Sequence, residues 1–274
     1  MNSALLGLVA ALSWGLHDFL ARFPSRAVGP IPTVFAVTLA GLIVLSVWLL
    51  FEGGGISIVW PSLWLVAVTG IFFTVATLSL FAALAVGPIS TVAPIAGSYP
   101  ALAMLFAVAQ GARPGLWQWL AIAAVMTGVA IVSRSGRHYE ASGDLERGRL
   151  KGILGLAFLA GFCFAVALTA GQAAVPIFGE VETGWLARCF GLVTIGTLYL
   201  WRSAKAPLPL RWFPVLGFMG LLDVIALGTI VVAGNLPDPA FATVVSSAFG
   251  AVTCCSLEYS SKSRSRPRSS GAWP

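Results

Sequence analysis

Long apolar segments alternate with short polar ones along most of the chain. They predict nine helices, at about residues 4–21, 33–51, 63–86, 90–109, 116–133, 152–175, 184–201, 212–233 and 240–255. About 20 consecutive apolar residues suffice for an α-helix to cross the roughly 30 Å hydrocarbon core of a bilayer. The segments lack the alternation with a period of two that marks the strands of a membrane barrel. The pattern therefore predicts an all-α membrane protein with about nine transmembrane helices.

Composition supports this class, since 58% of the 274 residues are hydrophobic and only 9% are charged, against about 25% charged in soluble domains. The net charge is +6, but the basic residues lie in the loops, where they fix the orientation of membrane helices. No basic face with interleaved aromatic residues indicates a nucleic-acid partner. The four cysteines form neither a disulfide framework nor a metal-binding spacing.

A long polar linker at 134–151 divides the chain into a first repeat, 1–133, and a second, 152–255, followed by a basic polar tail, 256–274. The two halves share their order of loops and helices. A shift of 150 residues places Thr33 on Thr183, Gly41 on Gly191 and Gly70 on Gly220. Because five helices form the first repeat, the second must enter the membrane with the opposite orientation, which is the inverted-repeat plan of many secondary transporters.

Several short motifs carry a family resemblance. They are Ala-Ala-Leu-Ser-Trp-Gly at 10–15, Gly-Pro-Ile-Ser-Thr-Val-Ala-Pro at 87–94, Ser-Tyr-Pro at 98–100, Trp-Gln-Trp at 117–119 and Gly-Val-Ala at 128–130. In these motifs and their arrangement, residues 1 to about 253 resemble the EamA-type members of the drug/metabolite transporter superfamily. The resemblance implies ten helices in two inverted repeats of five, a central cavity, and movement of small metabolites, often export of amino acids or related compounds.

The end of the chain departs from that family pattern. Residues 246–253 read like the counterpart of the fourth helix, but a tail rich in Arg, Ser and Pro follows Cys254 and Cys255. The second repeat is thus expected to hold four helices, with the tenth missing. A frameshift or truncation near residue 254 is the favoured interpretation, because out-of-frame GC-rich codons yield these residue types. The alternative is a genuine basic tail that rests on anionic lipid.

Asp223 is the clearest candidate for a functional ionisable group. It lies 11 residues after Trp212, about 16 Å along a helix and so near the middle of the bilayer. A charge at that depth costs several kcal/mol and usually faces a cavity or a partner. Asp223 could bind a substrate amine or a coupling proton, or it could be a structural carboxylate bonded to a neighbouring helix.

His17, Asp18 and Arg188 are the other ionisable candidates inside apolar segments. His17 can relay protons near neutral pH, although an interfacial position for His17 and Asp18 near Arg22 is the simpler alternative. Arg188 either extends to the membrane interface or neutralises an acidic group.

Neutral polar groups complete the candidate set. Pro94 and Pro100 each remove a helical hydrogen-bond donor, so they predict a hinge in helix 90–109 that presents Ser98 and Tyr99. The remaining substrate-site candidates are Trp14, Thr169, Gln172, Ser246 and Ser247. Single Ser and Thr residues more often bond their own helix or a neighbouring one.

The sequence thus predicts a secondary transporter that exports amino-acid-like or related metabolites by alternating access. A proton gradient is the expected driving force, because the sequence holds no ATP-binding motif. It also holds no nucleophile–base pair and no metal cluster, so neither enzymatic activity nor a cofactor is expected. The expected partners are a small molecule, the proton and the lipid of a bacterial inner membrane, with a homodimer left open. The alternatives are a non-transporting subunit or sensor on the same fold, and an inactive fragment.

Overall fold

The computed structural model describes residues 3–53, 57–109, 147–202 and 209–234, together with Gly55, individual residues between 111 and 131, and Val245, Ser246 and Phe249. Every regular element within these residues is helical, which confirms the predicted all-α class. The first half contains α1 (Ser3–Ala27), α2 (Pro30–Glu52), the 3-10 helix η1 (Trp60–Ser62), α3 (Leu63–Val86), α4 (Ile89–Ala96) and α5 (Tyr99–Ala109). The second contains α7 (Arg147–Phe178), α8 (Glu180–Arg202), the 3-10 helix η2 (Leu210–Trp212) and α9 (Phe213–Gly234).

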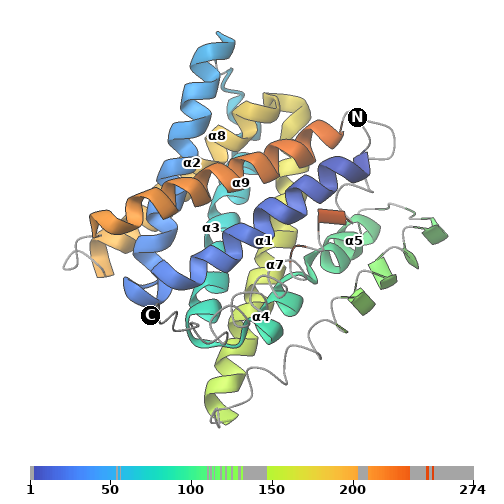
Figure 1. Ribbon diagram of the computed structural model, residues 1–274. Coiled ribbons are helices and arrows are strands. Elements are labelled where there is room, and N and C mark those ends of the chain that lie inside the picture. Colours follow the sequence, from blue (N-terminus) through green and yellow to red (C-terminus); the bar gives the residue numbers. More distant parts are fainter. Residues whose placement is uncertain are drawn as a thin grey trace, which may run out of the picture.

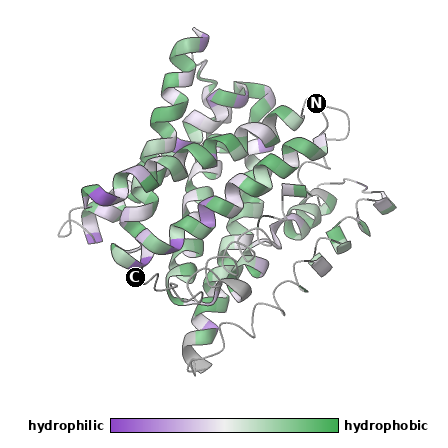
Figure 2. Ribbon diagram, in the orientation of Figure 1, coloured by the Kyte–Doolittle hydropathy of each residue, from purple (hydrophilic) through white to green (hydrophobic). Residues whose placement is uncertain are grey.

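Five of the described helical segments are long and apolar enough to cross a membrane. They are Ser3–Ala27, Pro30–Glu52, Trp60–Val86, Leu150–Phe178 and Leu210–Ile230. Hydrophobic residues dominate these helices along most of their length (Figure 2). The fold is therefore that of a multi-pass integral membrane protein. The whole tail, 256–274, and most of the predicted helix 240–255 lie outside the described residues. So do parts of helix 116–133 and of the linker.

The two largest differences from the predicted helix boundaries are at the end of α1 and at the start of α7. The first helix was predicted to end at Ala21, but α1 continues through Pro24 to Ala27. Near this end the Arg26 Nε donates a hydrogen bond of 2.9 Å to the carbonyl of Ala85 on α3, so Arg26 joins two helices instead of lying in a loop. In the second half α7 begins at Arg147, within the predicted linker.

The predicted helix 90–109 is divided into α4 and α5. Pro94 lies inside α4, and Pro100 lies in the first turn of α5, so the helix breaks at Gly97 and Ser98. Pro100 cannot donate to the carbonyl of Ala96. That carbonyl lies against Gly161 of α7, where a Cβ atom would be only 3.2 Å from the oxygen. The predicted break is therefore present, and it faces another helix.

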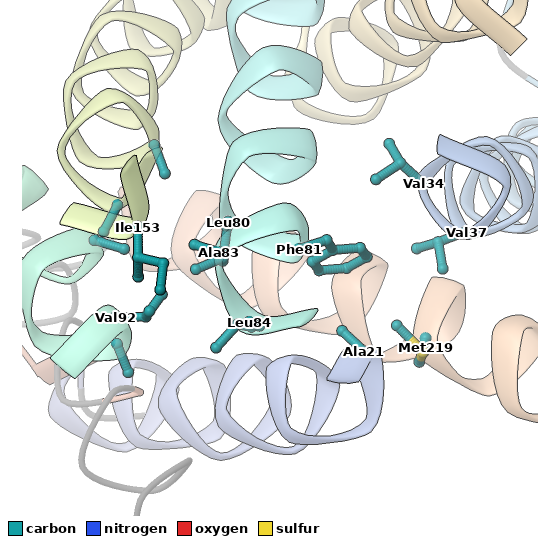
Figure 3. Close-up of a cluster of buried hydrophobic side chains, with 14 of the residues drawn as sticks. Ala21, Val34, Val37, Leu80, Phe81, Ala83, Leu84, Val92, Ile153 and Met219 are labelled. Atoms are coloured by element: carbon teal, nitrogen blue, oxygen red, sulfur yellow. The ribbon is translucent and has the colours of Figure 1, made fainter. Parts of the chain in front are cut away.

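The helices form two closely packed pairs, α1 with α9 and α3 with α7, and α2 contacts both α8 and α9. In Figure 1 the blue α1 and the orange α9 run side by side across the bundle. Figure 3 shows the buried core between the pairs, where the Phe81 ring of α3 points toward Val34 and Val37 of α2. Ala21 and Met219 belong to the same cluster.

Local structure repeats at the 150-residue shift seen in the sequence. Gly29 and Gly179 both have φ of 95°, a conformation that favours glycine, and each precedes a helix. The Thr33 hydroxyl donates to the Gly29 carbonyl at 2.8 Å, and the Thr183 hydroxyl donates to the Gly179 carbonyl at 2.6 Å. The shift also carries η1 onto η2. Both halves thus turn into their second helix in the same way.

The packing between helices repeats as well. The shift converts α1 into α7 and α3 into α9, so the α1–α9 contact becomes the α7–α3 contact. A Cβ atom on Gly220 would lie 2.9 Å from the amide nitrogen of Gly41, and one on Gly191 would lie 3.3 Å from the carbonyl oxygen of Gly70. These two contacts also exchange under the shift. The glycines therefore allow equivalent helices to approach closely on both sides of the bundle.

Candidate functional site

A cavity lies where helices of the two halves meet. It contains about 590 Å³ of empty space, counting the part that opens outward. Its lining comes from six helices, α1, α2, α3 and the short α5 of the first half and α7 and α9 of the second, together with Phe249. The lining residues are Trp14, His17, Asp18, Val37, Thr38, Phe73, Thr77, Leu80, Tyr99, Phe164, Leu168, Asp223 and Phe249.

Asp223 is held by residues of two other helices. Its Oδ2 accepts a hydrogen bond of 2.6 Å from the Arg188 Nη2 of α8. Its Oδ1 accepts one of 3.1 Å from the indole nitrogen of Trp14 on α1. Both carboxylate oxygens are therefore occupied, and the charge is matched by a cation in direct contact. Of the two interpretations of Asp223, this geometry favours a structural carboxylate at the wall of the cavity.

Arg188 crosses the bundle interior to reach Asp223. Only 7% of its surface is exposed, so it does not extend to the interface, and that alternative was wrong. Its path requires Gly41 of α2, because a Cβ atom there would lie 2.6 Å from the Arg188 Nε. A glycine on one helix thus makes room for the arginine of another.

His17 and Asp18 form a second polar pair, on α1. The His17 Nδ1 lies 2.9 Å from the Asp18 Oδ1, and the two residues are 4% and 5% exposed. They face the cavity, not the outer surface of the bundle. The other ring nitrogen of His17, Nε2, is buried without a hydrogen-bond partner. The pair therefore offers one nitrogen that can accept a proton or a hydrogen bond.

Aromatic rings form much of the remaining wall. Tyr99 stacks on Phe249 at 6.3 Å between ring centroids and tilts against Phe164 at 6.2 Å. The Trp14 ring meets Phe249 edge to face at 6.4 Å, and Phe73 meets Phe164 in the same way at 5.4 Å. The cavity thus has an aromatic wall beside its ionisable groups.

The other predicted site residues have different surroundings. Ser98 donates to the carbonyl of Ile95 at 2.7 Å and Thr169 to that of Ala165 at 2.7 Å, so each bonds its own backbone and neither lines the cavity. Gln172 is exposed. Ser246 is buried and hydrogen bonds to Tyr99. Ser247 lies outside the described residues.

Phe73, Phe164 and Phe249 line the cavity but were not predicted to do so. A phenylalanine in an apolar segment resembles one that faces lipid, so the residue type alone gives no signal. The 150-residue shift could have found all three, because it pairs Trp14 with Phe164, Tyr99 with Phe249 and Asp223 with Phe73.

Within the described residues, no group of three His, Cys, Asp or Glu side chains could hold a metal ion. Cys163 and Cys189 are free thiols.

Comparison with known proteins agrees with this architecture. Residues 1–134 match the model of the EamA-like transporter family. The match confirms the resemblance seen in the motifs and identifies the first half of the chain as an EamA-like transporter region. The family points to a membrane transporter. None of the curated proteins matches the chain.

Proposed function

We propose that the protein is a secondary transporter that moves small metabolites by alternating access. The single observation that carries this proposal is the cavity at the junction of the two halves, whose ionisable residues are buried inside an otherwise apolar bundle. Buried charges inside membrane helices usually mark a substrate or ion pathway.

The repeated packing supports the mechanism. The α1–α9 and α7–α3 contacts exchange under the 150-residue shift, as do the two close glycine contacts. Two inverted repeats packed in this way can adopt two equivalent arrangements. One arrangement becomes the other when the two halves exchange their conformations. Rocking between them would open the cavity to either side of the membrane in turn.

The lining supports a small amphipathic substrate. The lining holds both polar groups and aromatic rings, which together suit a molecule with a polar head and an apolar body. Export of amino-acid-like or related compounds across a bacterial inner membrane is the expected direction and location. The His17 Nε2 is the group through which a proton could drive the cycle.

Flux in proteoliposomes tests the proposal. Vesicles loaded with a mixture of unlabelled amines and amino acids would be placed in a trace of each labelled compound, and counterflow uptake would be followed. A transporter accumulates at least one label, and protein-free vesicles do not. Specific binding without counterflow would instead support a sensor or a non-transporting subunit. Absence of both would support an inactive fragment.

A further inference from the structure

The cavity lies between two ends of the bundle, at which different helices begin and end. At the first end α1 and α3 end and α9 begins, since Ala21 packs in one cluster with Phe81 and Met219. At the second end α9 ends and α1 begins, since Leu6 packs with Ala233. The 150-residue shift exchanges the two ends, because it carries α1 onto α7 and α3 onto α9. Each residue that closes one end can therefore be compared with an equivalent at the other.

The first end is filled by apolar side chains from four helices. Phe81 of α3 shares a buried cluster with Ala21 of α1, Val34 of α2 and Met219 of α9 (Figure 3). These four residues, the first gate, are at most 1% exposed. The Phe81 ring also lies 5.5 Å from the His17 ring, measured between centroids. Because His17 lines the cavity, the first gate begins directly at the cavity wall.

The second end has smaller residues at all four equivalent positions. In the order used above, the residues of this second gate are Val231, Gly171, Gly184 and Thr69. Thr69 lies one helical turn before Phe73, which lines the cavity. A Cβ atom on Gly171 would lie 3.3 Å from the Thr69 Cγ2, so a methyl group meets bare backbone at this point. Gly171, Gly184 and Thr69 are all partly exposed.

Opening the two gates exposes different kinds of surface to water. At the first gate water would meet the Phe81 ring and the side chains of Val34 and Met219, and the cost rises with the apolar area exposed. Separating these groups also forfeits dispersion contacts, whose sum grows with the number of packed atoms. At the second gate water would meet glycine backbone and Thr69, whose polar groups it can hydrogen bond. The second gate therefore costs less to open.

We propose that the cavity is closed by two unequal gates, so that the protein rests with the first gate shut and admits its substrate through the second end, with Phe81 setting this preference. The inference rests on the proposed function, since passage through both ends is a property of a transporter. The apparent dissociation constant of a ligand rises as the fraction of protein competent to bind it falls. Binding from the second end is therefore the tighter of the two.

Thiol labelling at symmetry-related positions measures each gate separately. Thr69→Cys reports on the second gate and Met219→Cys on the first, each in the full chain with its four native cysteines replaced by alanine and held in lipid nanodiscs. A charged methanethiosulfonate reagent modifies a thiol only where water reaches it. We expect Thr69→Cys to react at least about tenfold faster. Cysteine is smaller than methionine, so Met219→Cys itself loosens the first gate and works against the expected result.

Phe81→Val tests the residue that sets the preference, because it gives the first gate the residue type found at the equivalent position of the second. It should raise the labelling rate of Met219→Cys about tenfold. The control is Ile153→Ala, which removes apolar atoms from the same buried cluster. Ile153 packs against Gly87, in the turn between α3 and α4, so this variant loosens the core outside the gate. It should change the labelling rate by less than about twofold.

Gly184→Ala tests the second gate in the opposite sense, and it also serves if Phe81→Val does not fold. The added methyl group would lie 3.5 Å from the Leu45 Cδ1, which is an ordinary contact. The closed second gate therefore gains packing without strain. Labelling of Thr69→Cys should become about threefold slower.

Four results would overturn the inference. They are equal labelling of the two reporters, faster labelling of Met219→Cys, no labelling of either, and equal effects of Phe81→Val and Ile153→Ala. The proposed function is judged separately by counterflow. Unequal labelling in a protein without counterflow would support the unequal gates and overturn transport, whereas counterflow with equal labelling would support transport and overturn the unequal gates.

Discussion

The two sides of the cavity are built on the same scaffold but differ in charge. The 150-residue shift pairs Trp14 with Phe164 and Tyr99 with Phe249, so an aromatic ring stands at each of these four positions. The ionisable positions are not repeated. The residues at the equivalent positions are neutral: the shift pairs Asp18 with Leu168, Asp223 with Phe73 and Arg188 with Thr38.

The repeated residues thus determine the shape of the cavity, whereas the residues that are not repeated determine its charge. Glycine contacts, helix turns and aromatic walls occur twice, and they define the form of the enclosure. Each buried charge occurs once, so every electrostatic property of the site depends on a single residue. Variants in repeated features should therefore have matched effects in the two halves, whereas variants of the charges should not.

The largest effect is expected from Asp223→Asn. The substitution leaves the Arg188 guanidinium buried without a counter-charge, which should cost about 3–5 kcal/mol of folding stability. Unfolding in mixed micelles of denaturing detergent gives the measurement.

The control for Asp223→Asn is the double variant that adds Arg188→Gln. It removes both charges and keeps groups that can hydrogen bond, so most of the stability should return. A single variant as stable as the wild type would contradict the role of the pair. Transport retained in the double variant would show directly that the pair is structural.

Gly220→Ala should have an intermediate effect. Its Cβ would lie 2.7 Å from the Ala40 Cβ and 2.9 Å from the Gly41 nitrogen, so α2 and α9 must move apart at a cost of about 1–3 kcal/mol. The control lies on the same helix. Gly228→Ala meets no atom within 4 Å, and the gain in helix propensity should stabilise it by up to about 1 kcal/mol.

The symmetry-related substitution Gly70→Ala sharpens the comparison. Gly70 packs against the backbone of Ala187 on α8, so this variant should destabilise the protein in the same direction as Gly220→Ala. Opposite signs would show that the two halves are not packed equivalently.

The smallest effect is expected at the repeated threonines. Thr33→Val and Thr183→Val each remove one hydroxyl bond to a carbonyl four residues earlier, and each should change stability by no more than about 1 kcal/mol. The informative quantity is the difference between the two variants in the same unfolding assay. It should stay within about 0.5 kcal/mol, and a larger gap would break the equivalence of the two turns.

The sequence predicted most helices because a run of apolar residues long enough to span a bilayer has few alternatives. It also indicated the break near Pro94 and Pro100, since proline acts locally. It did not predict how far α1 extends, because the contact that joins Arg26 to Ala85 is made between helices.

The candidate site was predicted in part. A buried position for Asp223 follows from the cost of charge at depth, whereas the sequence left an interfacial position as the simpler alternative for His17 and Asp18. The pairing of Asp223 with Trp14 spans 209 positions and that with Arg188 spans 35, so only packing of three helices determines it. The amphipathic pattern offers no signal for such contacts in a segment that is apolar on every face.

The break between α4 and α5 has a consequence for the order of assembly. At 8 and 11 residues, the two helices extend only about 12 Å and 16 Å, and neither alone can cross a bilayer core of roughly 30 Å. Residues 89–109 must therefore enter the membrane as one unit. Their broken backbone is tolerated at depth only where protein covers it, and the covering residue, Gly161, belongs to α7. The first half of the molecule can thus complete its own structure only after the ribosome has delivered α7 to the membrane.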